Sequence, residues 1–296
     1  MTSSGILVVD KPGGMTSHDV VGRVRRLLGT RKVGHAGTLD PMATGILVVG
    51  VERATRLLGH LALADKRYRA TIRLGTATVT DDREGDVIAQ ADPATLAAIP
   101  DRGIVDALRG LTGSIEQRPS SVSAVKVDGR RAYDRVRGGE AVDLPARRVV
   151  IARLDALDLR RAPDAIDVDV DVECSTGTYV RAIARDLGDL LGVGGHLTAL
   201  RRTRVGPFEE SRALTLATLE AEGESALESM ADVAAACFPT WRLDESGSAA
   251  VRVGRRIPWE GPEPVGTPVA LFDPAGEFLA LASDDGGLAR YAAVFA

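Results

Sequence analysis

Apolar and polar residues alternate along two long stretches of this chain. Between Lys66 and Leu74 apolar residues alternate with arginine and threonine, and between Ile166 and Cys174 they alternate with aspartate and glutamate. Because successive side chains of a strand point to opposite faces of a sheet, each stretch predicts a strand with one apolar and one charged face. Shorter apolar runs predict three further strands, at 6–9, 46–49 and 196–205.

Helical spacing of apolar residues marks other parts of the chain. The first such helix carries valines and leucines on one face, and we expect Ser17 to cap its start and Gly29 to end it. Its arginines lie off the apolar stripe and should be exposed. Another helix follows the turn 175–178, with Arg181 in its first turn, where the helix dipole usually disfavours a cation. A further helix is predicted at 57–61, and helical structure is predicted after the turn 81–86 to about residue 111. More helices are predicted between the strand that ends at 205 and about residue 236.

The pattern changes after Phe238. Short alternating pieces broken by glycine and proline predict a small β-rich domain over 239–296, after a larger domain over 1–238. A domain of this size is marginal alone, so we expect it to dock on the larger one. The segment 118–148 has weak periodicity and is rich in serine, arginine and glycine, which predicts a long excursion from the core.

The composition is ordinary for a soluble globular protein, with 45% apolar and 26% charged residues in a chain of 296. No signal peptide and no apolar stretch of membrane-spanning length is evident, so we expect no membrane association. Cys174 and Cys237 lie far apart and match no metal spacing or disulfide framework. Such cysteine usage favours a reducing compartment, and we expect the protein in the cytoplasm.

Charge is unevenly distributed along the chain. The net charge is −4, yet basic residues gather at 23–32, at 118–148 and at 201–204. A basic face on an acidic body is compatible with a ligand that has a phosphate backbone. Clusters of this kind are also typical of solvated helix faces, and both interpretations stay open here.

One short segment, 34–45, combines three glycines, a histidine and an Asp-Pro step directly before a predicted buried strand. Glycine permits tight bends, and the residue before a proline is extended. Asp40 should therefore lie at a corner of a shaped loop against the core. Taken alone, the pattern fits an ordinary turn as well as a functional site.

Motifs for several other chemistries are missing from the sequence. It has no Gly-x-Ser-x-Gly elbow, no phosphate-binding loop and no His-Glu-x-x-His pattern, and its four histidines do not cluster. The acidic turn 81–86 fits no calcium-loop spacing. We expect neither a metal nor a cofactor. A carboxylate on a loop, an arginine at a helix start, tyrosines and a basic face together suggest a nucleic-acid-modifying site.

Four motifs, in their order and spacing, resemble the TruB family of tRNA pseudouridine synthases. They lie at 5–17, 34–45, 65–69 and 174–181, and the resemblance extends over residues 5 to 210. It implies the α+β pseudouridine-synthase fold, a mixed and mostly antiparallel sheet flanked by helices. The segment 118–148 resembles the family's thumb, which clamps the T-loop of tRNA. The C-terminal domain resembles a PUA-like RNA-binding domain more loosely.

The resemblance also implies roles for individual residues. Asp40 corresponds to the catalytic aspartate, and Arg181 to the arginine that pairs with it. Tyr68 corresponds to the tyrosine that stacks on the target uracil, and Tyr179 to another active-site residue. Lys11 and Pro12 correspond to a motif that supports the catalytic loop. His35 corresponds to a histidine that contacts RNA near the flipped nucleotide, and Leu200 to an apolar residue of the pocket wall.

The implied activity is the isomerisation of uridine 55 in the T-loop of tRNA to pseudouridine, by a stand-alone monomer without a guide RNA. Extrusion of the uracil from the base stack costs on the order of a few kcal/mol. Stacking of the extruded base on an aromatic ring offsets about 1–3 kcal/mol of this cost. Arg181 would keep Asp40 ionised. Asp40 would then act in one of three ways, by attack at C1′, by attack at C6 or by removal of the C2′ proton, and the sequence does not distinguish among them.

Two other functions remain open at this point. One is a catalytic subunit that depends on a guide RNA and on partner proteins. The other is a protein that binds or folds tRNA without catalysis.

Overall fold

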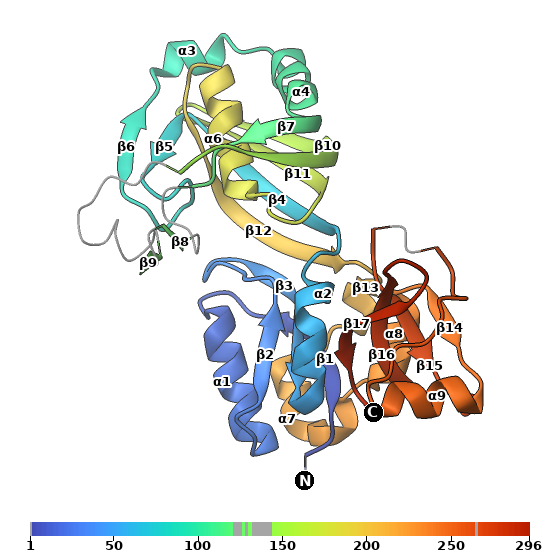
Figure 1. The fold of residues 1–296 in the computed structure, drawn as a ribbon. Coiled ribbons are helices and arrows are strands. Elements are labelled where there is room, and N and C mark those ends of the chain that lie inside the picture. Colours follow the sequence, from blue (N-terminus) through green and yellow to red (C-terminus); the bar gives the residue numbers. More distant parts are fainter. Residues whose placement is uncertain (1, 121–125, 128–129, 132–143, 264–265) are drawn as a thin grey trace.

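The computed structural model describes residues 2–120, 126–127, 130–131, 144–263 and 266–296. Within them, one long sheet runs through two lobes (Figure 1). Its strands follow in the order β1 (Gly5–Lys11), β3 (Thr44–Val51), β12 (Gly195–Val205), β4 (Lys66–Leu74), β11 (Ala165–Cys174), β10 (Arg147–Ala162) and β7 (Gly113–Gln117). β2 (Val33–Ala36) pairs with β3, and β13 (Phe208–Glu209) with β12. The five strands expected from the sequence are confirmed.

The sheet is mostly antiparallel, as expected. Along its order each neighbouring pair is antiparallel except β12 and β3, which are parallel at Arg201 opposite Thr44 and Arg202 opposite Gly45. This one parallel contact joins the lobes, and the loop that carries Asp40 lies directly beside it.

The upper lobe of Figure 1 holds β4, β7, β10 and β11 with three helices on one face, α3 (Pro93–Ala97), α4 (Asp101–Gly110) and α6 (Val180–Leu190). Apolar residues of the strands and helices form one buried cluster, which includes Ile72, Val170, Ile104 and Leu187. A small hairpin of β5 (Thr76–Thr78) and β6 (Val87–Gln90) lies at its edge. This cluster places the start of α6 above the apolar face of β4.

The charged faces of β4 and β11 neutralise each other. In the antiparallel register Arg73 lies opposite Asp167, and its Nε and Nη2 both donate to that carboxylate at 2.8 Å. Arg67 makes a two-pronged contact to Asp171. The basic face and the acidic face expected separately are therefore two halves of one ion-paired surface.

The lower lobe holds β1, β2 and β3 with α1 (Ser17–Leu28), α2 (Leu58–Leu61), α7 (Leu216–Glu222) and the short 3-10 helices at Glu52–Leu57, Glu210–Arg212 and Gly223–Ala226. The expectation that Ser17 caps α1 is wrong. Thr16 is the N-cap residue and forms a reciprocal capping box with Asp19. Gly29 ends the helix in the left-handed conformation, with φ 63°, and Arg25 and Arg26 are exposed, as expected.

The chain continues through α8 (Met230–Cys237) into a second sheet, β14 (Thr240–Arg242), β15 (Val269–Phe272), β16 (Phe278–Asp284) and β17 (Ala289–Val294), beside α9 (Glu245–Arg252). Its phenylalanines 272, 278 and 295 share a buried cluster with Ile6 and Val8 of β1. The β-rich C-terminal part therefore docks on the larger body, as expected. No helix in the described parts of the chain is long and apolar enough to cross a membrane.

Most of the excursion expected at 118–148 lies outside the described residues. Two short strands, β8 (Lys126–Val127) and β9 (Arg130–Arg131), pair within it.

Candidate active site

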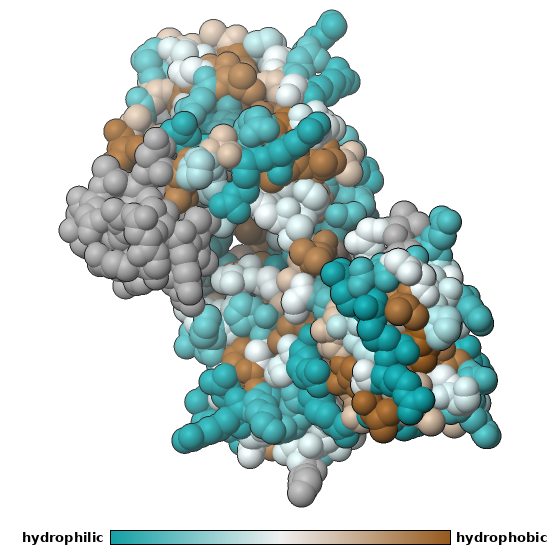
Figure 2. Space-filling model, viewed as in Figure 1, coloured by the Kyte–Doolittle hydropathy of each residue, from teal (hydrophilic) through white to brown (hydrophobic). Residues whose placement is uncertain are grey.

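A pocket of about 270 Å³ lies where the two lobes meet. The space-filling surface is hollowed between the lobes (Figure 2). The pocket is lined by the loop between β2 and β3, by Ala62 after α2, by the start of β4, by the turn before α6 with the first residues of that helix, and by β12. Its volume is just below the range of about 300–1,000 Å³ typical of small-molecule pockets, so it can hold a small ligand.

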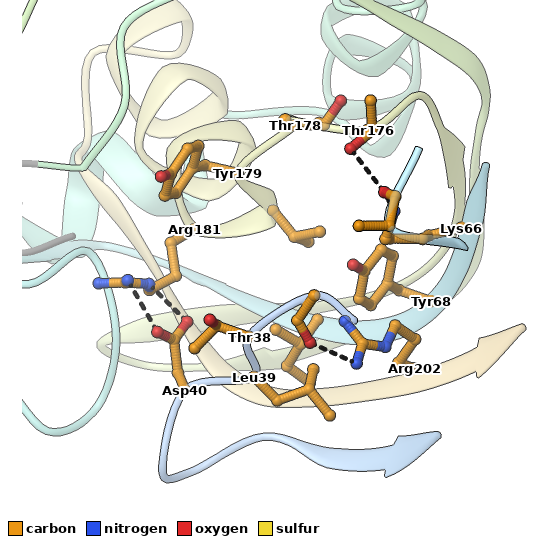
Figure 3. A pocket seen from close by; sticks show the side chains of 15 residues that line it. Thr38, Leu39, Asp40, Lys66, Tyr68, Thr176, Thr178, Tyr179, Arg181 and Arg202 are labelled. Atoms are coloured by element: carbon orange, nitrogen blue, oxygen red, sulfur yellow. Dashed lines mark hydrogen bonds and ion pairs between the residues drawn. The ribbon is translucent and has the colours of Figure 1, made fainter. Parts of the chain in front are cut away.

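The structure brings five of the seven expected site residues together around this pocket. Asp40, Tyr68, Tyr179, Arg181 and Leu200 line it, whereas Lys11 and His35 do not (Figure 3).

Asp40 and Arg181 form an ion pair inside the pocket. Nη2 of Arg181 donates to Oδ1 at 3.0 Å, and Nε lies 2.9 Å from Oδ2 without hydrogen-bond alignment. The arginine side chain is 6% exposed, whereas the aspartate is 32% exposed and faces the open space. The pairing expected from the family resemblance is therefore present, and it leaves the carboxylate accessible to a ligand.

The other side of Arg181 is held by the acidic turn 81–86. Nη1 donates to the carbonyl of Thr80 at 2.9 Å and lies 3.5 Å from Oδ2 of the buried Asp82. Asp82 in turn accepts from Thr80 and from the amide of Glu84. The described residues contain no cluster that could hold a metal ion. Asp82 belongs to the site, and spacing alone gave no sign of it.

Two buried side chains hold the loop that carries Asp40. The Ser17 hydroxyl accepts from the Leu39 amide at 2.9 Å and donates to the Leu39 carbonyl at 3.2 Å. Lys11 donates through Nζ to three carbonyls, those of Pro12 at 2.9 Å, Met15 at 2.6 Å and Pro41 at 3.2 Å. Burial lowers the pKa of Lys11 to about 8. The backbone of Leu39 and of Pro41, on either side of Asp40, is thus held by hydrogen bonds from Ser17 and Lys11.

Gly45 allows β3 to approach β12 closely. It has φ 97°, and a Cβ there would lie 2.2 Å from the carbonyl oxygen of Arg202. The approach places the buried Arg202 under the pocket, where it donates to the carbonyls of Ile46 at 2.7 Å and Gly37 at 3.0 Å.

The basic cluster 201–204 is not an open basic surface. Arg201 contacts Asp10 and Glu210, and Arg204 contacts Glu173. Arg202 is 1% exposed. Each guanidinium of this cluster has acceptors in the protein, and a phosphate-binding face here stays a prediction.

Tyr68 and Tyr179 stand on two sides of the pocket (Figure 3). Tyr68 is 7% exposed, and burial raises the pKa of its phenol, which is therefore neutral. The guanidinium of Arg147 lies 5.7 Å from the ring centre of Tyr179, within cation–π range. Leu200 adds an apolar wall.

Comparison with known proteins gives the same family over the whole length. Residues 25–180 match the model of the TruB family pseudouridylate synthase N-terminal domain. This chain belongs to the TruB family. Residues 181–236 match a tRNA pseudouridylate synthase B C-terminal domain, and residues 238–296 match the C-terminal region of tRNA pseudouridine synthase II.

Relatives named tRNA pseudouridine synthase B resemble this TruB chain end to end. That of Leifsonia xyli subsp. xyli is 55% identical over 98% of this chain and 96% of its own. That of Cutibacterium acnes is 57% identical over 95% of this chain and 94% of its own.

Solved structures give the same fold. A chain of a Cbf5-Nop10-Gar1 complex superposes with a TM-score of 0.74 at 27% identity, covering 98% of this chain and 84% of that one. A chain of an H/ACA RNP bound to a substrate RNA containing 2′-deoxyuridine gives 0.75 at 26% identity, covering 99% and 85%. The α+β fold expected from the TruB resemblance is confirmed.

His35 lies apart from the pocket of this TruB chain, on β2. Its ring faces that of His18 edge-on, with centres 5.4 Å apart, and its buried Nδ1 has no hydrogen-bond partner among the residues that the structure describes. Burial lowers the pKa of His35 to about 4, so the imidazole is neutral near pH 7.

Lys66 also lines the pocket and was not among the site residues expected from the sequence. Its Nζ donates to the carbonyls of Ala62 and Ala64 at 2.9 and 2.7 Å, and burial lowers its pKa to about 8. The signal available was its place two residues before Tyr68 in an alternating strand, which puts both side chains on the buried face.

Proposed function

We propose that this protein is a tRNA pseudouridine synthase that converts uridine 55 of the T-loop to pseudouridine. The observation that carries the proposal is the Asp40–Arg181 pair, which opens into a base-sized pocket between Tyr68 and Tyr179 in a chain of the TruB family. The enzyme acts in the cytoplasm as a monomer, without guide RNA or cofactor.

The reaction is an isomerisation, so no co-reactant is needed. The N1–C1′ bond breaks, the uracil turns, the C5–C1′ bond forms, C5 loses its proton and N1 gains one. The pocket keeps the detached uracil in place during this exchange. Asp40 acts on the sugar or on the base by attack at C1′, by attack at C6 or by removal of the C2′ proton.

The positions of Tyr68, Lys11 and Leu200 support the roles that we propose for them. Tyr68 stacks on the extruded uracil, since stacking on an aromatic ring returns about 1–3 kcal/mol. Lys11 supports the catalytic loop through the Pro41 carbonyl, and Leu200 closes one wall of the pocket. His35 contacts the RNA next to the flipped nucleotide as a neutral hydrogen-bonding group.

We further propose that the catalytic domain spans 1–238, that 118–148 clamps the T-loop, and that 239–296 is a PUA-like domain that adds RNA contacts. Phosphate contacts would make affinity for tRNA fall steeply with salt.

A second candidate, a guide-dependent catalytic subunit, is favoured by the superposition on a chain of an H/ACA RNP. The relatives at 55% and 57% identity named tRNA pseudouridine synthase B favour the stand-alone enzyme.

The test is to incubate the purified protein with an unmodified tRNA transcript, without guide RNA, and to map pseudouridine. We expect one pseudouridine, at position 55, and none in a matched transcript with cytidine there. Absence of modification at position 55 contradicts the proposal, and modification only with added guide RNA supports the second candidate.

A further inference from the structure

Gln117 is a buried amide on the last residue of β7, 1% exposed. Its side chain makes a paired contact to the backbone of a single residue, Tyr179. Oε1 accepts from the Tyr179 amide at 2.8 Å, and Nε2 donates to the Tyr179 carbonyl at 3.1 Å. Both backbone groups of Tyr179 are thereby held by a side chain from a different part of the fold.

The contact falls where α6 begins. Tyr179 is the N-cap residue of α6, and no side chain caps this helix from that position. By contrast, α1, α7, α8 and α9 are capped by the side chains of their own N-cap residues, Thr16, Thr215, Ser229 and Asp244. At the start of α6, Gln117 instead holds the N–H and the carbonyl of the N-cap residue itself.

A second contact ties the same end of β7 to α6. The carbonyl of Arg118 accepts from Nη2 of Arg185 at 2.8 Å. Gln117 and the residue that follows β7, Arg118, therefore contact the start and the second turn of this helix.

The start of α6 carries two pocket groups. The Tyr179 side chain lines the pocket, and Arg181 follows two residues later with its 3.0 Å bond to Asp40. A rotation of the peptide at 179 would move both side chains, and a misplacement of about 1 Å is enough to cost roughly a hundredfold in rate.

We propose that Gln117 is a positioning residue, which sets the placement of Tyr179 and Arg181 through the Tyr179 backbone. The inference rests on the proposed function, since it concerns the same site. It predicts that loss of the amide lowers the rate of the chemical step and leaves the binding of tRNA unchanged.

The test compares Gln117→Met with Ser248→Ala. Methionine keeps the length of the side chain and removes both hydrogen bonds. Ser248 lies on α9 with its side chain buried and donates to the Asp244 carbonyl, so its substitution removes a hydrogen bond far from the pocket. We expect kcat to fall roughly ten- to a hundredfold in Gln117→Met, with KM and the Kd for tRNA within twofold of wild type. Ser248→Ala should keep the wild-type kcat.

A wild-type kcat in Gln117→Met, or a rise of KM in place of a fall of kcat, overturns the inference. If Gln117→Met does not fold, Gln117→Asn replaces it, because asparagine stays neutral and keeps the amide but is one methylene too short to reach both backbone groups of Tyr179. The same fall of kcat at constant KM is then expected, and its absence overturns the inference.

Hydrogen exchange decides the inference separately from activity. Amides 179–183 should exchange faster in Gln117→Met while those of α1 stay unchanged, and unchanged exchange at 179–183 overturns the inference. A wild-type protein that modifies no tRNA contradicts the proposed function alone.

Discussion

Replacing Arg181 by lysine tests whether the geometry of the Asp40 pair matters beyond its charge. The guanidinium contacts both oxygens of Asp40, the Thr80 carbonyl and, at 3.5 Å, Asp82. A lysine ammonium is a compact charge on a flexible stem and cannot reproduce this planar fork. The variant therefore keeps the charge and loses the orientation of the carboxylate.

The expected size of the effect follows from the hydrogen bonding that lysine cannot replace. A hydrogen bond to a charged group contributes about 1.5–3 kcal/mol, and at least one such bond to Asp40 disappears. Since each 1.36 kcal/mol of barrier is tenfold in rate, kcat should fall by roughly ten- to 150-fold. Affinity for tRNA should change little, because Arg181 is buried behind the carboxylate.

The assay is single-turnover formation of pseudouridine in a tRNA transcript, together with tRNA binding. Arg73→Lys is the control, because Arg73 also contacts both oxygens of an aspartate, Asp167, on the opposite face of the sheet. It should retain wild-type turnover. A rate for Arg181→Lys within threefold of wild type, or an equal loss in Arg73→Lys, refutes the reasoning.

Two further predictions concern the support of the catalytic loop. Because burial lowers the pKa of Lys11 from 10.5 to about 8, the unfolded chain binds this proton more tightly, and stability contributed by Lys11 rises with pH above 8. The free energy of unfolding of wild type minus that of Lys11→Met should therefore increase by up to about 3 kcal/mol as pH rises from 8 to 10.5. Urea titrations of both proteins at several pH values measure this difference, and a difference that does not change with pH would contradict the prediction. Ser17→Ala should lower kcat several-fold, because it frees Leu39 beside Asp40, whereas Thr16→Ala should cost about 1 kcal/mol of stability and keep activity. Equal turnover in the two variants would show that Ser17 does not act through the loop.

Strand positions could be predicted from the sequence because their periodicity is a local property. The alternations at 66–74 and 166–174 gave both strands within a residue or two, and their opposite charges match across the sheet. The cap of α1 was misplaced by one residue, since serine and threonine are both good caps and only tertiary contacts draw Ser17 toward Leu39.

The site was predictable only in part. Asp40 and Arg181 are 141 residues apart, so their pairing was accessible through the family motifs and not through spacing. Arg202 was grouped with surface arginines, because sequence does not show that the glycine at 45 lets β3 close over it. Asp82 and Gln117 were missed for a similar reason, since their partners come from α6.

The most direct test of the account is turnover by Asp40→Asn on unmodified tRNA without guide RNA, measured beside tRNA binding. Asparagine keeps the size of the side chain and removes its charge and basicity. The account predicts that pseudouridine at position 55 forms with wild type and falls to the background with the variant, while the Kd for tRNA stays within a few-fold. Turnover by Asp40→Asn near the wild-type rate would contradict it.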